Sequence, residues 1–173
     1  DGVIGLKTTL LEAFGSTKLD QVANNYFLDP VGGGQGPTLK YQGGIVVTGE
    51  FSSGASAWSP IAAEQTATGY IVAWKLAGTD TYTVWSTDAN GNYIANIIPA
   101  VSGSSSWDFE SIETTFKQDL NGDGVIGIPN IEAFGATRLD KVGANYFLDP
   151  VSGGQGPTLK YQGAPVVTGQ FVS

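Results

Sequence analysis

Short runs in which apolar and polar residues alternate recur along the chain and predict antiparallel β-strands. In residues 70–74 and 82–85 every second side chain is large, so we expect one face of a meander to be rich in aromatic residues. Turn signals separate the runs, among them residues 42–44 and 88–91. The predicted strands are residues 19–22, 25–28, 38–41, 45–48, 69–75, 80–86 and 92–97.

A helix is predicted after this meander and ends near Gln118. Ser105 or Ser106 can cap its N-terminus, and acidic residues occupy its first turn, where the helix dipole favours negative charge. A shorter helix over residues 8–14 is a further option. The expected fold is therefore mainly β (α+β), with antiparallel meander or sandwich-like units and one short helix in each repeat. The apolar face of the longer helix consists of Phe109, Ile112 and Phe116.

An internal repeat dominates the sequence. Residues 12–51 (the first copy) recur as residues 132–171 (the second copy), and only nine of the forty aligned positions differ. Residues 54–122 occur once and contain all four tryptophans. We therefore divide the chain into one complete unit, residues 1–130, and the first part of the next, residues 131–173. We expect it to be a portion of a longer tandem array.

Composition narrows the classes of function. The chain has 173 residues, a net charge of −8, and neither His nor Cys. A Ser-His-Asp triad, a thiol nucleophile, a disulfide framework and the usual zinc, haem or copper sites are therefore excluded. The negative charge argues against nucleic acid or an anionic membrane as a partner. No apolar run is long enough to span a bilayer, and a Gly-rich chain without cysteine fits an exported bacterial protein.

One motif carries recognisable chemistry. Asp119, Asn121 and Asp123 occupy alternate positions and are followed by Gly124, which reproduces the first part of a calcium-binding loop. Alternate oxygen-bearing side chains can surround one hard cation, and the glycine permits the sharp turn. The carbonyl oxygen of Val125 would be a fourth ligand. The sequence therefore predicts a Ca²⁺ site formed by Asp119, Asn121, Asp123 and Val125.

The ligand that would complete this calcium site is left open. An EF-hand has an acidic side chain at the twelfth loop position, where this chain has Asn130. Glu132, Glu12 or another acid could close the shell, and the alternative is a hydrated turn without an ion. At the N-terminus only residues 1–4 of the motif remain, so we expect that site to bind weakly or not at all.

Two other readings of the residues are considered. Flat aromatic rings can stack on sugars, although tryptophans placed in strands more often fill a core; the four are Trp58, Trp74, Trp85 and Trp107.

A carboxylate pair could support glycoside hydrolysis. For the acids near the start of the helix, however, a role at the helix dipole suffices. We expect no catalytic residues. The carboxylates considered are Glu64, Asp108, Glu110 and Glu113.

The motifs NYFL, GPTLKY, YTVW and QDLNGDGVIG make the chain resemble the tryptophan-rich C-terminal repeat domain family of large secreted, RTX-like bacterial proteins of cyanobacteria and proteobacteria. The resemblance covers nearly the whole chain and implies an extracellular, non-catalytic, calcium-associated module. Its residues are 25–28, 36–41, 64–67, 69–74, 82–85, 91–93 and 118–127.

These observations predict a calcium-binding structural repeat of a secreted bacterial surface or extracellular-matrix protein. The loop at residues 119–125 would act as a calcium clip at the junction between units. Neighbouring copies of the repeat would be the partners, assembling head-to-tail into a fibre, stalk or filament, because part of a unit lacks its other half. The alternative is a carbohydrate-binding or adhesive module that accompanies a secreted enzyme and has a polysaccharide as partner.

Overall fold

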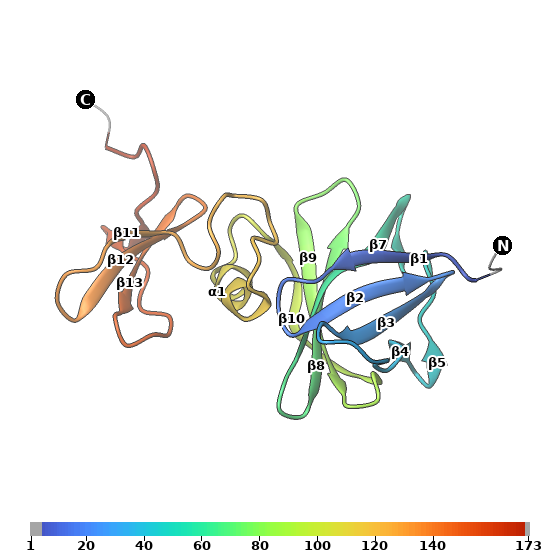
Figure 1. Cartoon of the computed structure of the whole chain (residues 1–173). Coiled ribbons are helices and arrows are strands. Elements are labelled where there is room, and N and C mark those ends of the chain that lie inside the picture. The colour runs from blue at the N-terminus through green and yellow to red at the C-terminus, as the bar shows by residue number, and fades with distance from the viewer. Residues whose placement is uncertain (1–4, 172–173) are drawn as a thin grey trace.

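A five-stranded antiparallel sheet lies at the centre of the protein, in a computed structural model that describes residues 5–171 (Figure 1). The strand order is β10-β9-β8-β7-β6. Both faces of the sheet are covered, so the middle strands are buried along most of their length. The strands are β6 (Ser52–Ser53), β7 (Ser56–Gln65), β8 (Gly69–Leu76), β9 (Thr81–Asp88) and β10 (Tyr93–Ser102).

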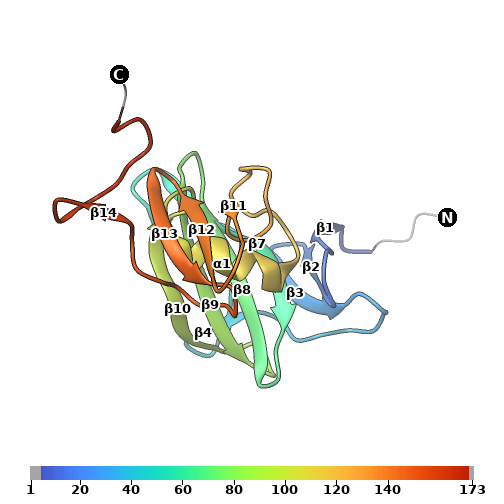
Figure 2. The same cartoon turned by 90° about the vertical axis from the view of Figure 1, so that its left-hand side faces the viewer.

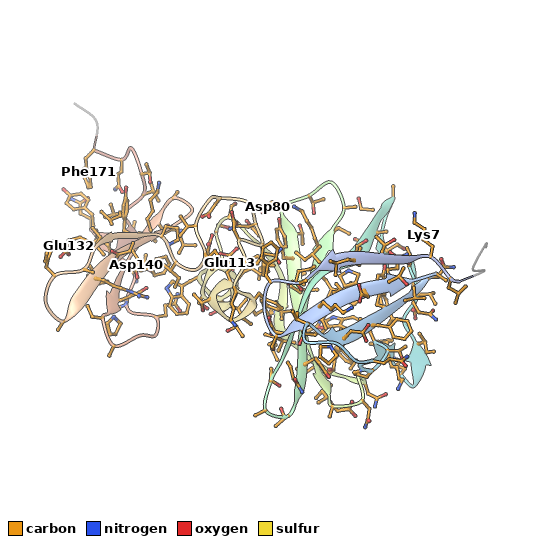
Figure 3. All side chains as sticks on the ribbon, viewed as in Figure 1. Lys7, Asp80, Glu113, Glu132, Asp140 and Phe171 are labelled. Carbon is orange, nitrogen blue, oxygen red and sulfur yellow. The ribbon has the colours of Figure 1, made fainter. Side chains whose placement is uncertain are left out.

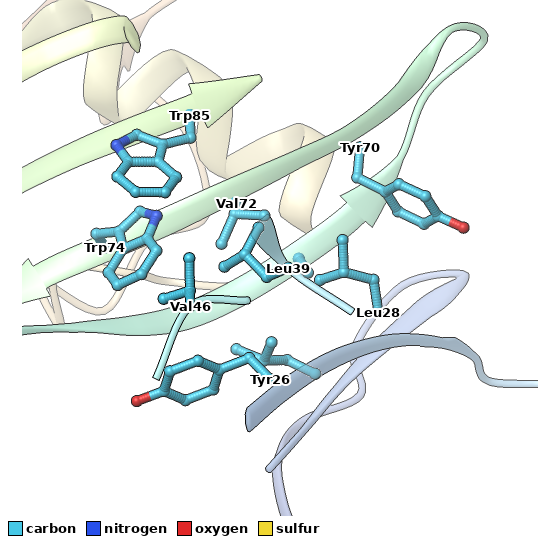
Figure 4. Close-up of a cluster of buried hydrophobic side chains, with 10 residues drawn as sticks. Tyr26, Leu28, Leu39, Val46, Tyr70, Val72, Trp74 and Trp85 are labelled. Atoms are coloured by element: carbon cyan, nitrogen blue, oxygen red, sulfur yellow. The ribbon is translucent and has the colours of Figure 1, made fainter. Parts of the chain in front are cut away.

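The first copy covers one face of this central sheet. It contributes a three-stranded sheet and a short hairpin, whose inward side chains, among them Leu19 and Leu28, pack on Val72, Trp74 and Trp85 in one buried cluster (Figure 4). The alternating pattern of the sequence is the cause, since every second residue of a strand points to the same face. The strands are β1 (Thr8–Glu12), β2 (Thr17–Val22), β3 (Asn25–Pro30), β4 (Lys40–Tyr41) and β5 (Gly44–Ile45).

The single helix of the described residues, α1 (Trp107–Phe116), covers the opposite face of the central sheet. Ser106 caps its N-terminus by accepting a hydrogen bond from the backbone N–H of Phe109, as the sequence predicts. Phe109 and Phe116 are buried against Tyr82 and other residues of the sheet. The first unit therefore has three layers: the first copy, the central sheet and the helix.

The second copy lies beyond α1, on the side away from the first copy (Figures 1 and 2). It repeats the pairing of the first: Thr17 faces Pro30 in β2–β3, and Thr137 faces Pro150 in β12–β13. Its strands are β11 (Asn130–Glu132), β12 (Thr137–Val142), β13 (Asn145–Pro150), β14 (Lys160–Tyr161) and β15 (Ala164–Pro165).

The prediction of a mainly β fold with antiparallel sheets and one helix is confirmed. The optional helix over residues 8–14 is wrong, because Thr8–Glu12 pairs with β2 as strand β1. Strand β7 was not predicted, although it lies between the two covering layers. Residues 1–4, where a truncated calcium loop was considered, are outside the described residues. Among residues 5–171, no helix is long and apolar enough to cross a membrane.

Candidate functional site

The predicted calcium loop follows α1 and folds back onto it. The helix ends at Phe116, and Lys117 adopts a left-handed conformation with φ of 55°. Glu113, which is fully buried, then holds the loop through its carboxylate (Figure 3). Its Oε1 accepts from the N–H groups of Leu120 (2.7 Å) and Asn121 (3.2 Å), and its Oε2 accepts from Gly127 (3.0 Å). One helix carboxylate therefore fixes both ends of the loop.

The loop side chains turn toward the loop's own backbone. The Oδ1 of Asp119 accepts from the N–H of Gly122 at 2.7 Å, and its Oδ2 accepts from Gly124 at 2.8 Å. Asn121 Oδ1 accepts from the N–H of Asp123 at 2.9 Å. The positive φ values at Gly122 (85°) and Gly124 (92°) allow this tight turn. The three predicted side-chain ligands therefore lie in one compact turn.

Glu110 is a second acidic side chain of the helix that contacts this loop. Only 1% of it is exposed, and its Oε1 accepts a hydrogen bond from Asn121 Nδ2 at 2.8 Å. Its Oε2 has no hydrogen-bond partner. Burial, with the nearby charges of Asp123 and Glu113, raises the pKa of Glu110 to about 8. A buried carboxylate with a free oxygen next to two loop aspartates is the environment in which a cation would relieve repulsion.

The donor set fits calcium rather than a softer metal, because every available atom is an oxygen. Within residues 5–171, no three Asp, Glu, His or Cys side chains gather into a metal-binding group. Two carboxylates with an amide and a backbone carbonyl oxygen lie outside this criterion, whereas the three acids Asp119, Asp123 and Glu110 do not converge into such a group in this structure. The unpartnered Oε2 of Glu110 adds one further oxygen beside Asn121.

The two acids named from the sequence as completing ligands are engaged elsewhere. Glu132 accepts a hydrogen bond from the N–H of Phe134, two residues further along the chain. Glu12 accepts from Phe14 and, at 3.2 Å, from Ala63 in strand β7. The sequence reading assigned Glu110 to the helix dipole and did not consider it as a ligand.

The dipole explanation is insufficient for the helix acids, because Glu110 and Glu113 are buried and bind the loop. The helical spacing contains the signal that could have identified Glu113. It lies four residues after Phe109 and three before Phe116, so it falls on the apolar face of the helix. An acid on the core-facing stripe of a helix requires partners, and the loop supplies them.

The raised pKa of Glu110 predicts that stability without metal falls as the pH rises. The folded chain holds a proton on Glu110 up to about pH 8, whereas the unfolded chain releases it near 4.5. Between these values folding takes up a proton, so the free energy of unfolding decreases with pH by at most about 1.4 kcal/mol per pH unit from this group. Urea unfolding in EGTA at pH 5, 6, 7 and 8 measures this slope, and Glu110→Gln should flatten it.

The loop also lies beside the second copy. Trp107 Nε1, at the start of α1, donates to Asp149 Oδ2 at 2.8 Å, and the N–H of Lys141 donates to Pro129 O at 2.9 Å. A hollow at this junction is lined by residues of the loop and of the second copy, including Asp123, Val125 and Lys141. The candidate metal loop is therefore the segment that joins the helix to the second copy.

Gly143 fits the second copy against the segment before α1. The first copy has Ala23 at this position, and both residues have positive φ, 53° and 58°. A Cβ at Gly143 would lie 3.0 Å from Ser104 O and from Ser105 Cβ. The repeat therefore lacks a side chain where the two parts touch.

Gly143→Ala is expected to loosen this junction and to destabilise the chain by about 1 kcal/mol or more, because the added methyl group has no room. The measurement is urea unfolding combined with amide exchange at Lys141. Ala23→Gly is the matched control, and it should leave the exchange of Lys141 unchanged. Equal exchange in Gly143→Ala and the parent chain would contradict the fit.

The remaining sequence-predicted groups occupy different surroundings. Glu64, in β7, is buried and accepts from the N–H and hydroxyl of Ser16, while Asp108 is exposed. Trp74 and Trp85 are buried in contact, with ring centroids 4.5 Å apart. Trp58 and Trp107 are half-buried and belong to strand β7 and helix α1, respectively. The expectation that tryptophans fill the core thus holds for Trp74 and Trp85.

The fold and the loop define a mainly β domain in which an aromatic-rich antiparallel sheet lies between a smaller β layer and one helix. The sequence profile of the family described as "Tryptophan-rich Synechocystis species C-terminal domain" matches residues 17–127. The chain therefore belongs to this family. The matched segment includes most of the first copy, the central sheet, the helix and the predicted calcium loop. Neither the curated proteins nor the solved structures provide a match to the chain.

Proposed function

We propose that the protein is a non-catalytic, calcium-binding structural repeat of a secreted, RTX-like bacterial surface or extracellular-matrix protein. The unpartnered oxygen of buried Glu110 beside the Asp119–Asn121–Asp123 turn is the observation that carries the proposal. Calcium would be held by these three loop side chains and by the carbonyl oxygen of Val125. Glu110 takes the place of the missing acid at the end of the loop. A single ion would neutralise the local excess of negative charge.

The position of the loop supports a structural role for the ion. Residues 119–129 connect the helix of the first unit to the second copy, and the loop contacts both. Binding calcium there would stiffen the connection between successive repeats, residues 1–130 and those from 131 onward. Abundant calcium outside the cell and a net charge of −8 fit folding after export. Repeats joined in this way would assemble head-to-tail into a fibre or stalk.

Thermal unfolding in millimolar Ca²⁺ and in EGTA tests this function. Saturation at one hundred times the dissociation constant stabilises by about 2.7 kcal/mol, which raises the Tm by roughly 5–10 °C in a chain of this size. Asp119→Asn/Asp123→Asn is the matched variant, because it removes both charges and keeps one accepting oxygen at each position. Residue 119 then loses its hydrogen bond with either Gly122 or Gly124, so each chain is compared with itself with and without calcium. The double variant should unfold at the same temperature with and without calcium. A parent chain that does not respond to calcium would refute the proposal.

A carbohydrate-binding or adhesive module is the second candidate, and one pocket favours it. A pocket of about 470 Å³ is lined by Trp58, Trp74 and Trp85 together with Glu50 and Asn96. Trp58 is half-buried and is the tryptophan of this pocket on which a sugar ring could stack. Quenching of tryptophan fluorescence by soluble polysaccharides would support this reading if Trp58→Ala abolishes it. The absence of quenching across a panel of glycans would exclude the carbohydrate-binding function.

A further inference from the structure

The second copy has an open apolar face that the first copy buries. Leu28 is fully buried, whereas its counterpart Leu148 is 37% exposed. Phe171, labelled in Figure 3, is 66% exposed. Six of the seven side chains of this face, all except Leu148, line a hollow of about 520 Å³. All seven have the same residue type in the first copy, where they pack on the central sheet. The face consists of Leu139, Tyr146, Leu148, Leu159, Tyr161, Val166 and Phe171.

The opposite face of the second copy is already in use. Asp140, Val142, Phe147 and Asp149 alternate with the residues of the open face and are buried, and Asp149 accepts the hydrogen bond from Trp107. The strand alternation therefore gives each copy two different faces. In the second copy one face meets the helix, and in the first copy the other face meets the five-stranded sheet.

The open face is already folded in the form that binds a sheet. Tyr161 and Phe171 make an edge-on contact with centroids 5.3 Å apart, as Tyr41 and Phe51 do in the first copy. The N–H of Val166 donates to Leu159 O at 2.8 Å, which repeats a bond of the first copy at 2.9 Å. Because these contacts exist without a partner, docking would require little ordering of the backbone or side chains.

The polar contacts that fix the register in the first copy are also available in the second. Thr17 Oγ1 accepts from the N–H of Gln65 at 2.9 Å, and Thr137 is its counterpart. A Cβ at Gly15 would collide with the carboxylate of Glu64, and its counterpart Gly135 also lacks a side chain, with a positive φ of 85° that Gly15 does not have. The other preserved contact groups are Glu132 and Lys160, which match Glu12 and Lys40.

One polar contact is lost between the copies. Ser16 Oγ donates to Glu64 Oε2 at 2.9 Å, and the second copy has Ala136 at this position. A docked second copy would therefore lack this hydrogen bond but keep the backbone N–H that also points at Glu64. The difference makes the first copy the stronger binder of its own sheet.

We propose that the open face of residues 130–171 is a docking surface for the β7–β9 face of a second copy of this chain, in the register that the first copy uses. The inference rests on the proposed role as a head-to-tail repeat and names the contact that would join the molecules. Within one chain the first copy occupies that sheet. The covalent connection between them keeps the first copy at a high effective concentration near the sheet. The second copy lies across α1 (Figure 1), so it can reach this sheet face only in another molecule, where it would replace that molecule's own first copy.

Cysteine cross-linking tests the register, since the natural chain has no cysteine. The donor chain carries Thr137→Cys. The acceptor chain carries Gln65→Cys together with Leu19→Asp and Leu28→Asp, which release its first copy from the sheet. On mixing under mild oxidation, most of the limiting chain is expected as a disulfide-linked heterodimer. A donor that also carries Leu139→Asp and Leu148→Asp is the matched control and should not cross-link.

A second experiment covers the case in which the acceptor chain fails to fold. Thr137→Cys and Gln65→Cys chains of otherwise natural sequence are mixed and warmed to a temperature at which amide exchange shows the first copy opening. Slow accumulation of the same heterodimer supports docking, and its absence while the first copy opens overturns it. Both experiments are repeated in EGTA. The interface contains no residue of the 119–125 loop, so failure of the calcium proposal alone would leave the cross-link intact.

Discussion

Leu28→Ala is expected to lower the free energy of unfolding by about 2–5 kcal/mol, whereas Leu148→Ala should lower it by about 1 kcal/mol or less. The two leucines occupy equivalent positions of the repeat, but only Leu28 is buried against the central sheet. Removing its side chain leaves a cavity in the buried cluster that includes Val72 and Trp74, while Leu148 is already 37% exposed. The difference would arise because the central sheet covers Leu28 and does not cover Leu148, and not from the local sequence.

Urea unfolding of both variants at low protein concentration measures this contrast. Low concentration matters because docking between molecules would cover Leu148 and increase its contribution. Ile94→Ala, at an exposed position of the central sheet, serves as a further control and should have little effect. Equal losses at Leu28 and Leu148 would contradict the two different environments of the copies.

Opposite effects are expected from neutralising the two buried helix acids in EGTA. Glu113→Gln should destabilise the chain by about 2–4 kcal/mol, because the new amide nitrogen cannot accept from the N–H of Gly127 or from the other two donors. Glu110→Gln should stabilise it at pH 8, since it removes a buried charge that Asp123 and Glu113 repel. The substitution keeps an oxygen that can accept from Asn121.

Calcium should reverse the effect of Glu110→Gln on stability relative to the parent chain. In millimolar Ca²⁺ the parent chain gains stability from the ion, and Glu110→Gln gains less because one charged oxygen ligand is lost. Urea midpoints for the parent and both variants, with and without calcium, measure these effects. A Glu110→Gln chain that gains as much from calcium as the parent would exclude Glu110 from the site.

Much of the architecture follows from the sequence pattern. The alternating large residues of 70–74 and 82–85 predicted strands β8 and β9, and Ser106 caps α1 as expected. Strand β7 was missed because its Ala-rich, Pro-containing segment shows no clear alternation, and pairing with β8 determines its structure. Residues 8–12 form a strand for the same reason, since pairing with β2 overrides a weak helical pattern.

Only part of the candidate site could be predicted from the sequence. Asp119, Asn121 and Asp123 are close in sequence, so their spacing was sufficient to predict a loop that could hold calcium. Glu110 and Glu113 reach the loop because the left-handed turn at Lys117 sends the chain back over the helix. That reversal depends on tertiary packing. The open face of the second copy likewise became visible only by comparing the burial of identical residues in two settings.

Calcium titration of the metal-free chain by isothermal calorimetry is the most direct test of the central claim. The expected result is a single bound Ca²⁺ per chain. Asp119→Asn/Asp123→Asn should bind at least about tenfold more weakly, a change of about 1.4 kcal/mol or more. Magnesium should compete poorly, since it requires a smaller octahedral shell. Binding of equal affinity in the double variant, or no calcium binding by the parent chain, would contradict the calcium loop at residues 119–125.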